Sequence, residues 1–114
     1  MKVDQKSAMP GTLAQLLSDA GSQLARRRIA RRMTQALAAE RARISRNTVS
    51  RIENGDPSVA VGQVVRYLDA LEHADVFLRA LAAENDPAVR MLEIREKTRR
   101  ARALTAKELE RYDF

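Results

Sequence analysis

The sequence has no cysteine and a single histidine, His73, among its 114 residues. Without cysteine there are no disulfides, no thiolate metal ligands and no cysteine nucleophiles, which suits a reducing cytoplasm. A lone histidine also excludes His-rich metal sites and paired-histidine chemistry. We therefore expect neither a metal nor a cofactor, and we expect His73 to pack at a corner between two helices.

Long uncharged runs are missing too. The longest covers residues 7–18, only 12 residues, which is too short to span a bilayer. Asp4 and Lys6 interrupt the start of the chain, so no secretory signal is visible. The sequence thus predicts a cytoplasmic protein with no membrane partner.

Aromatic residues make up only 4% of the chain, and no stretch alternates apolar and polar residues with period two. Strands are therefore not expected, and the chain should be all-α. Hydrophobic residues make up 45%, which is enough for one domain with a small core and an appended tail.

Positive charge is concentrated in one part of the chain, whose formal net charge is +6. Residues 24–52 contain nine arginines and one acid, whereas residues 53–89 contain seven acids and two arginines. Residues 90–112 are mixed, with eight bases and four acids. Solvated helix faces are the ordinary explanation for scattered arginines. The density of residues 24–52 instead favours an anionic partner, such as nucleic acid, a membrane surface or an acidic protein.

The first half of the chain predicts four helices. Thr12 is expected to cap a first helix with Leu13, Leu16 and Leu17 on one face, and Gly21 is expected to break it. A second helix should cover residues 22–32. Residues 35–42 and 46–54 should form two more. Thr34 and Ser45 are their expected N-caps, and Gly55 should end the second of them.

The second half predicts further helices. One apolar stripe is expected to be core: Val61, Val64, Val65, Leu68 and Leu71. A helix over residues 75–83 should turn three side chains inward: Phe77, Leu78 and Leu81. Asp86 and Pro87 should begin another helix, which carries Val89 and Leu92. Thr105 and Glu108 form a capping-box pattern, which predicts a last short turn.

The helices at residues 35–42 and 46–54 are separated by only about three residues, a spacing typical of a helix-turn-helix. The polar face of the second helix consists of Arg46, Asn47, Ser50 and Arg51, and Val49 and Ile52 should point inward. Arginine pairs bidentately with guanine and asparagine with adenine in the major groove. The helix starts at Thr34 and Ser45 also offer free backbone N–H groups to phosphates.

A family resemblance rests on Thr34-Gln35, Ala39, Ala42, Ile44-Ser45-Arg46 and the run from Thr48 to Gly55. These residues resemble the Cro/C1-type helix-turn-helix of phage repressors and xenobiotic-response-element (XRE family) regulators, over residues 24–71. The resemblance implies a five-helix, lambda-repressor-like domain that binds double-stranded operator DNA as a homodimer.

The resemblance also implies roles for individual residues. Base contacts fall to Arg46, Asn47 and Arg51. Thr48, Ser50 and Asn54 would lie nearer the DNA backbone, and Gln35 would brace a phosphate or a base. Together with Arg43 and the helix starts at Thr34 and Ser45, these residues make up the predicted phosphate-contacting group. An ion pair between Arg28 and Glu53 should join the first helix of this domain to the recognition helix.

Two positions depart from the family pattern, which usually has leucine in place of Ala38 and glycine in place of Arg43. Ala38 should fill less of the core than leucine does, and Leu37 or Met33 would occupy the remaining space. Arg43 must adopt a backbone conformation that glycine favours, unless the turn differs.

The last third of the chain, with its basic run at residues 99–102, resembles regulators encoded beside HipA-type serine/threonine kinases, the HipB-like antitoxins. This implies a partner-binding tail, in which Tyr112 and Phe114 are plausible anchors for a partner pocket. A frayed tail is the simpler alternative.

These observations predict an N-terminal helical extension at residues 1–20, a DNA-binding domain at 21–84 and a helical tail at 85–114. The expected function is a dimeric repressor that acts as the antitoxin of a HipBA-like module and autoregulates its operon. The alternatives are a stand-alone regulator, or a helical interaction module or RNA-binding adaptor. Residues 24–52 lack the aromatic platforms typical of single-strand binders. No serine is marked as a partner for His73, so we do not expect an enzyme.

Overall fold

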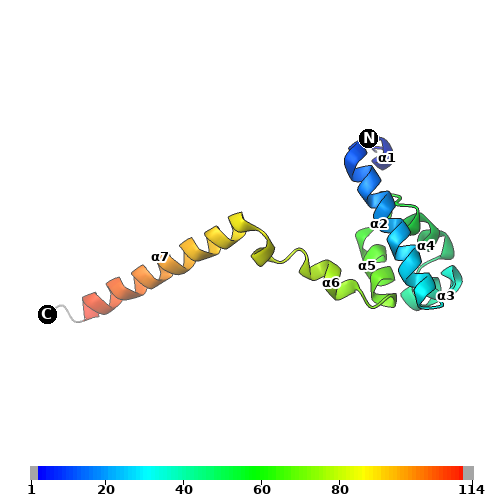
Figure 1. Ribbon diagram of the computed structural model, residues 1–114. Helices are drawn as coiled ribbons and strands as arrows, with labels where there is room; N and C mark the ends of the chain where they lie inside the picture. Colours follow the sequence, from blue (N-terminus) through cyan, green and yellow to red (C-terminus); the bar gives the residue numbers. More distant parts are fainter. Residues whose placement is uncertain (1–2, 112–114) are drawn as a thin grey trace. The chain divides into compact units, whose positions relative to one another are not determined.

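The computed structural model describes residues 3–111, and all the regular structure in that range is helical (Figure 1). The helices are α1 (Gln5–Ala8), α2 (Gly11–Ala30), α3 (Gln35–Ala42), α4 (Arg46–Glu53), α5 (Val61–Ala70), α6 (Ala74–Arg79), the short 3₁₀ helix η1 (Ala83–Asn85) and α7 (Pro87–Arg111). The all-α prediction is therefore confirmed. Within residues 3–111, none of these helices combines the length and apolar character that a bilayer crossing requires.

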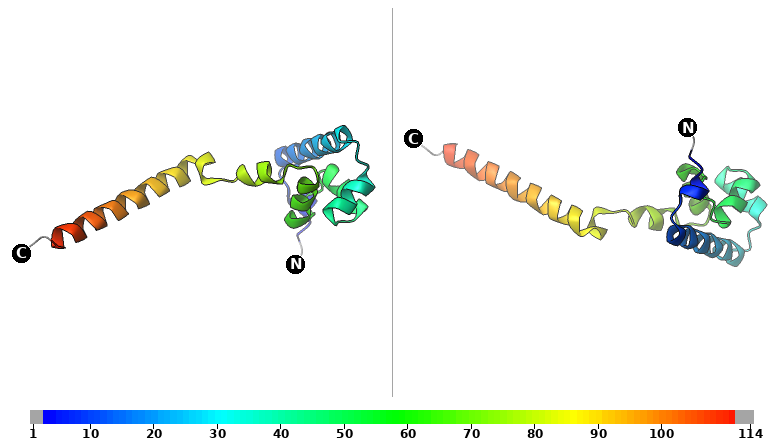
Figure 2. Two further views of the ribbon diagram at one scale, coloured as in Figure 1. Left: turned by 90° about the horizontal axis from the view of Figure 1, so that it is seen from below. Right: turned by 90° about the horizontal axis from the view of Figure 1, so that it is seen from above.

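The chain divides into two compact units, one up to Phe77 and one from Leu78 onwards. In the first unit α4 lies against α2, α3 and α5, and α3 also lies against α5 (Figure 2). The second unit consists mainly of α7.

The α2 helix runs without interruption from Gly11 to Ala30, so the predicted break at Gly21 is wrong. A Cβ atom at Gly21 would lie 2.5 Å from the backbone oxygen of Glu53 and 2.7 Å from that of Ile52. The glycine thus allows the end of α4 to approach the α2 backbone. The predicted cap at Thr12 is also wrong, because α2 begins after Pro10.

The core lies between α2, α3, α4 and α5. It consists of Met33, Ala38, Ala39, Val49, Ile52, Tyr67 and Leu71, against which Leu37, Ile44 and Val64 also pack. Ala38 is fully buried, and Met33 and Leu37 both pack in the cluster that surrounds it. The predicted stripe on α5 is correct at Leu68 and Leu71, which are buried. It is wrong at Val61, which is 71% exposed in the first turn of α5.

Four helices end with the same backbone motif, in which one residue adopts a left-handed conformation. The four residues are Arg32, Arg43, Gly55 and Glu72. At each end the next residue donates its N–H five positions back along the chain, as Ile44 does to the Ala39 carbonyl at 3.0 Å. This is the Schellman arrangement, and three of its four left-handed residues carry side chains.

In the second unit α7 begins at Pro87, and the Asp86 carboxylate accepts the Ala88 N–H at 2.9 Å, which confirms the predicted start. The predicted new turn at Thr105 is wrong. Its hydroxyl donates to the Ala101 carbonyl at 3.0 Å inside a continuous helix.

Exposure of apolar side chains differs from the prediction around α6. Phe77, Leu78 and Leu81 were expected to face inward, but they are 41%, 50% and 75% exposed. The helix is also shorter than predicted, because α6 ends at Arg79 instead of residue 83, and Leu81 lies beyond its end. The two predicted partner-binding anchors of the tail, Tyr112 and Phe114, lie outside the described residues.

Candidate nucleic-acid interface

The turn between α3 and α4 brings the two helices together. It spans three residues, from Arg43 to Ser45, and Arg43 has φ 57° and ψ 45°. This is the left-handed conformation in which the family usually has glycine, and we predicted it for Arg43 if the turn followed the family pattern. Ile44 follows it and packs against the core, so α4 leaves the turn in a fixed direction.

Both helices of the pair carry the predicted N-caps. The Thr34 hydroxyl accepts the N–H of Leu37 at 3.0 Å, and the Ser45 hydroxyl accepts the N–H of Thr48 at 3.0 Å. Thr34 and Ser45 are exposed, so the first turns of α3 and α4 begin at the protein surface. Helix starts of this kind attract anions through free N–H groups and the helix dipole.

The exposed side of α4 carries the residues predicted to read bases. Arg46 and Asn47 follow the Ser45 cap directly, and both are exposed. Val49 is fully buried and Ile52 is 6% exposed on the opposite side, as predicted. The start of α4 therefore presents a guanidinium and a carboxamide to solvent, while its other face is anchored in the core.

Three residues of the predicted interface have side chains that bond within the protein, and one of them is Gln35, whose amide donates to Glu53 at 3.0 Å. Thr48 is only 6% exposed and its hydroxyl bonds to the Ser45 hydroxyl at 2.8 Å, so it belongs to the cap. Arg51 donates from Nε to Asp56 at 2.9 Å and from Nη2 to the Ser58 hydroxyl at 2.6 Å. Ser58 in turn donates to the Asp56 carboxylate from its backbone N–H at 2.9 Å and from its hydroxyl at 2.6 Å. These two hydrogen bonds and the Arg51 contact hold the pKa of Asp56 well below its usual range.

A buried carboxylate fastens α4 to three other helices. Arg28 of α2 donates to Glu53 from Nε at 2.7 Å and from Nη2 at 3.0 Å, so the predicted ion pair is present. Tyr67 of α5 and Gln35 of α3 donate to the same carboxylate, the latter at 3.0 Å. Arg28 also donates to the Met33 carbonyl at 2.8 Å.

Burial alone would disfavour the charged form of Glu53, but hydrogen bonds from Arg28, Tyr67 and Gln35 outweigh it, and its pKa is lowered. Burial and the hydrogen bond to Glu53 raise the pKa of Tyr67 far above its usual value. The hydrogen bond to Glu53 raises the pKa of Arg28. The network is therefore an ionised pair with a neutral phenol.

Tyr67 was missed in the sequence analysis, although it is fully buried. A signal was available, because Tyr67 lies three residues after Val64 and four before Leu71 on the α5 stripe. A buried tyrosine needs a hydrogen-bond partner for its hydroxyl, and Glu53 supplies it.

The remaining predicted contact residues lie before, on and after α4. Arg43 lies in the turn before α4, Ser50 lies on α4, and Asn54 directly follows its last residue. Arg43 and Asn54 are exposed. His73 is half-buried after α5, and its Nε2 lies 3.1 Å from Nη2 of Arg31. This agrees with the predicted corner packing.

A family model described as a helix-turn-helix domain matches residues 19–83, which is more than half of the chain. The match covers most of α2 and all of α3 to α6. Neither the curated proteins nor the solved structures gave a match to the chain.

Proposed function

The chain belongs to the helix-turn-helix domain family, and from this premise we propose that it is a Cro/C1-type repressor that binds operator DNA sequence-specifically. The observation that carries the proposal is the pair Arg46 and Asn47, exposed together at the capped start of α4. In helix-turn-helix proteins the first turn of the second helix contacts base edges. Arginine and asparagine supply bidentate donors and acceptors for guanine and adenine.

Rigid support makes this pair suitable for reading bases. The opposite side of α4 is held by Val49 and Ile52 in the core and by Glu53 in its hydrogen-bond network. A recognition helix fastened in this way loses little conformational freedom on binding DNA, which favours affinity.

Phosphate contacts are assigned to the surface around α4. The group consists of Thr34, Gln35, Arg43, Ser45, Ser50 and Asn54. Thr48 is omitted because it is buried. Arg51 contacts bases only if its bonds to Asp56 and Ser58 are exchanged for bonds to DNA.

The protein acts as a homodimer, with the two recognition helices about 34 Å apart on an inverted repeat. Exposed apolar side chains at Phe77, Leu78 and Leu81 supply a surface for the second copy. A single α4 reads only a short stretch of DNA, so a dimer is needed for a long operator.

The DNA-binding proposal is tested with an operator selected from random sequences. Arg46→Ala and Asn47→Ala should each lose about 1–3 kcal/mol of binding free energy on the selected operator and much less on random DNA. Arg90→Ala, on α7, is the matched control and should leave both affinities unchanged. Equal losses on both DNAs would move Arg46 and Asn47 into the phosphate-contacting group.

The second unit supports a finer assignment, that the protein is the antitoxin of a HipA-type kinase. In α7 the apolar side chains Met91, Leu92 and Ile94 are 50%, 52% and 54% exposed, among several basic residues. A partner that covered these side chains would remove apolar surface from water, which favours binding. The family match ends at residue 83, just before this helix.

A truncation after Glu84 separates the two roles. Operator affinity should change by less than about tenfold, while rescue from a co-expressed neighbouring kinase should be lost. If the truncated protein still neutralises the kinase, the tail is not its binding site. If no kinase is encoded beside the gene, the protein is a stand-alone regulator.

A further inference from the structure

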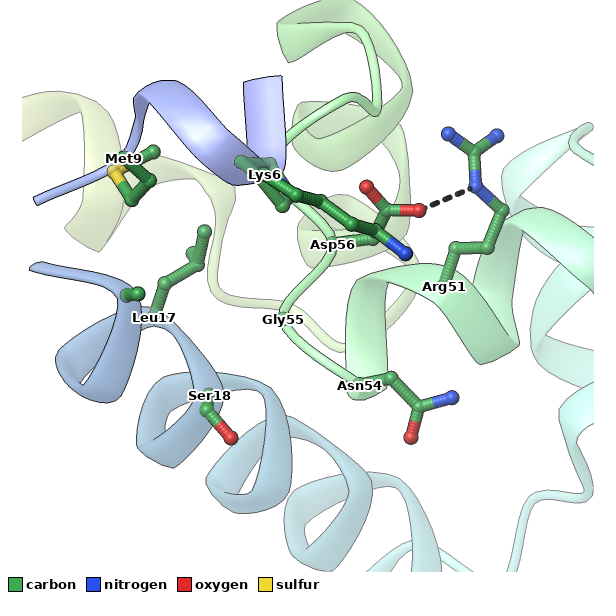
Figure 3. Close-up of a pocket in the computed structure, with 10 residues that line it drawn as sticks. Lys6, Met9, Leu17, Ser18, Arg51, Asn54, Gly55 and Asp56 are labelled. Carbon is green, nitrogen blue, oxygen red and sulfur yellow. Dashed lines mark hydrogen bonds and ion pairs between the residues drawn. The ribbon is translucent and has the colours of Figure 1, made fainter. Parts of the chain in front are cut away.

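A pocket of about 340 Å³ lies beside the C-terminal end of α4, within the first unit (Figure 3). Its volume is in the range of small-molecule sites. The apolar part of its wall comes from Met9, Ala14, Leu17 and Pro57. In Figure 3 Met9 and Leu17 lie at one end of the pocket, and Asp56 and Asn54 lie at the other.

The wall formed by α2 and the end of α4 is preformed. Gly55 has φ 73°, and a Cβ there would lie 2.7 Å from Cα of Ser18, so the two backbones are in direct contact. The opposite wall is α1, a four-residue helix with no buried residue, joined to α2 through extended Met9 and Pro10. One side of the pocket is therefore rigid and the other can adjust to an occupant.

The charges on the pocket wall select an anion with a single charge. Arg51 and Asp56 already neutralise each other through a contact of 2.9 Å. Lys6 adds one further positive charge on the wall, and Asn54 offers amide N–H donors at the same end. A carboxylate would balance Lys6, whereas a doubly charged phosphate would remain half unbalanced.

From this geometry we propose that the pocket binds a small amphipathic monocarboxylate, whose carboxylate contacts Lys6 and Asn54 and whose apolar body contacts Met9 and Leu17. The lining includes Arg51 and Asn54, which the proposed function places at the DNA interface. A carboxylate that neutralises Lys6 removes a positive charge beside these residues and occupies the Asn54 amide, so the ligand acts as an inducer that weakens operator binding. This regulatory step rests on the proposed function, but the binding step does not.

The binding step is tested by NMR on the full chain without DNA, with phenylbutyrate as the probe and uncharged phenylbutanol as its control. Phenylbutyrate should shift the amide resonances of Leu17, Ser18 and Gly55 in a saturable way. Phenylbutanol should bind at least about tenfold more weakly, because it cannot pair with Lys6. The absence of saturable shifts up to about 10 mM, or equal affinity for both compounds, would overturn the site.

Three variants locate the site. Lys6→Gln should remove the difference between the two compounds, whereas Lys97→Gln, on α7, should preserve it. Ala14→Phe, at an exposed position on the wall, should abolish binding of both compounds by filling the pocket. Shifts that persist in Ala14→Phe would place the binding elsewhere and refute the proposal.

The regulatory step is tested by operator affinity with and without saturating phenylbutyrate. The compound should weaken operator binding by about fivefold or more in the wild type, and DNA should weaken phenylbutyrate binding by the same factor. Ala14→Phe should bind operator normally and not respond. If phenylbutyrate binds but operator affinity stays constant, the inducer role is wrong. If no DNA binding is found at all, the proposed function fails while the NMR result stands.

Discussion

Replacing Glu53 with alanine should strongly destabilise the first unit. The side chains of Arg28 and Glu53 are 11% and 6% exposed, so Glu53→Ala leaves a nearly buried guanidinium whose remaining bond is to the Met33 carbonyl. The hydroxyl of fully buried Tyr67 also loses its acceptor. Breaking a buried ion pair by removing one partner costs about 3–5 kcal/mol, and the whole stability of a small domain is typically about 5–15 kcal/mol.

The assay is urea denaturation followed by circular dichroism, with three comparison variants. Glu40→Ala removes an exposed glutamate from α3 and should change stability by no more than about 0.5 kcal/mol. Glu53→Gln should lose less than Glu53→Ala because its amide oxygen still accepts from Arg28. The double variant Arg28→Met with Glu53→Met removes both charges and should also lose less. A loss below about 1 kcal/mol for Glu53→Ala would refute the buried network as the fastening of α4.

Three further results are expected. The lowered pKa of Glu53 means that its ionisation stabilises the fold fully above the ordinary carboxyl value of 4.5 and that this contribution is lost as the pH falls towards the lowered pKa. Urea titrations at a series of acidic pH values should therefore show a shallower pH dependence for Glu53→Gln than for the wild type. Glu72→Gly should raise the thermal midpoint, with a gain of up to about 1 kcal/mol, because Glu72 has a φ of 63°, whereas Glu72→Ala should give no gain. Operator affinity should fall with salt with a log–log slope of about −5 or steeper, and a slope near zero would contradict arginine–phosphate contacts.

The features predicted correctly from the residue pattern are mostly those that neighbouring residues determine, whereas the Arg28–Glu53 pair, which joins residues 25 positions apart, was predicted from the family resemblance. A serine that precedes a helix can bond its own first turn, as Ser45 does with Thr48. Asp86 caps α7 in the same way, and Gly55 ends α4 because glycine adopts a positive φ easily. These interactions span at most a few residues, so the pattern of residue types is enough to predict them.

The errors have two sources: contacts between segments far apart in the chain, and helix boundaries at which the local pattern was misleading, as at Thr12 and Thr105. From its local sequence Gly21 was predicted to break the helix. In the structure it lets the end of α4, which is more than 30 residues away in the chain, approach the α2 backbone closely. The base contact of Arg51 stays a prediction, but the sequence pattern did not indicate that the loop after α4 supplies Asp56 and Ser58 as partners for its guanidinium. The apolar periodicity placed Val61 in the core, because a pattern of residue types does not show that this residue, in the first turn of α5, is exposed.

The central claim is that the first turn of α4 reads bases in the major groove. Methylation interference on the selected operator tests it, because methylation of guanine N7 blocks the bidentate contact of an arginine. For the wild type, methylation of at least one guanine in each half-site should abolish binding. For Arg46→Ala the same methylation should have no further effect, while interference at other guanines persists. An identical interference pattern for the wild type and Arg46→Ala would contradict the account.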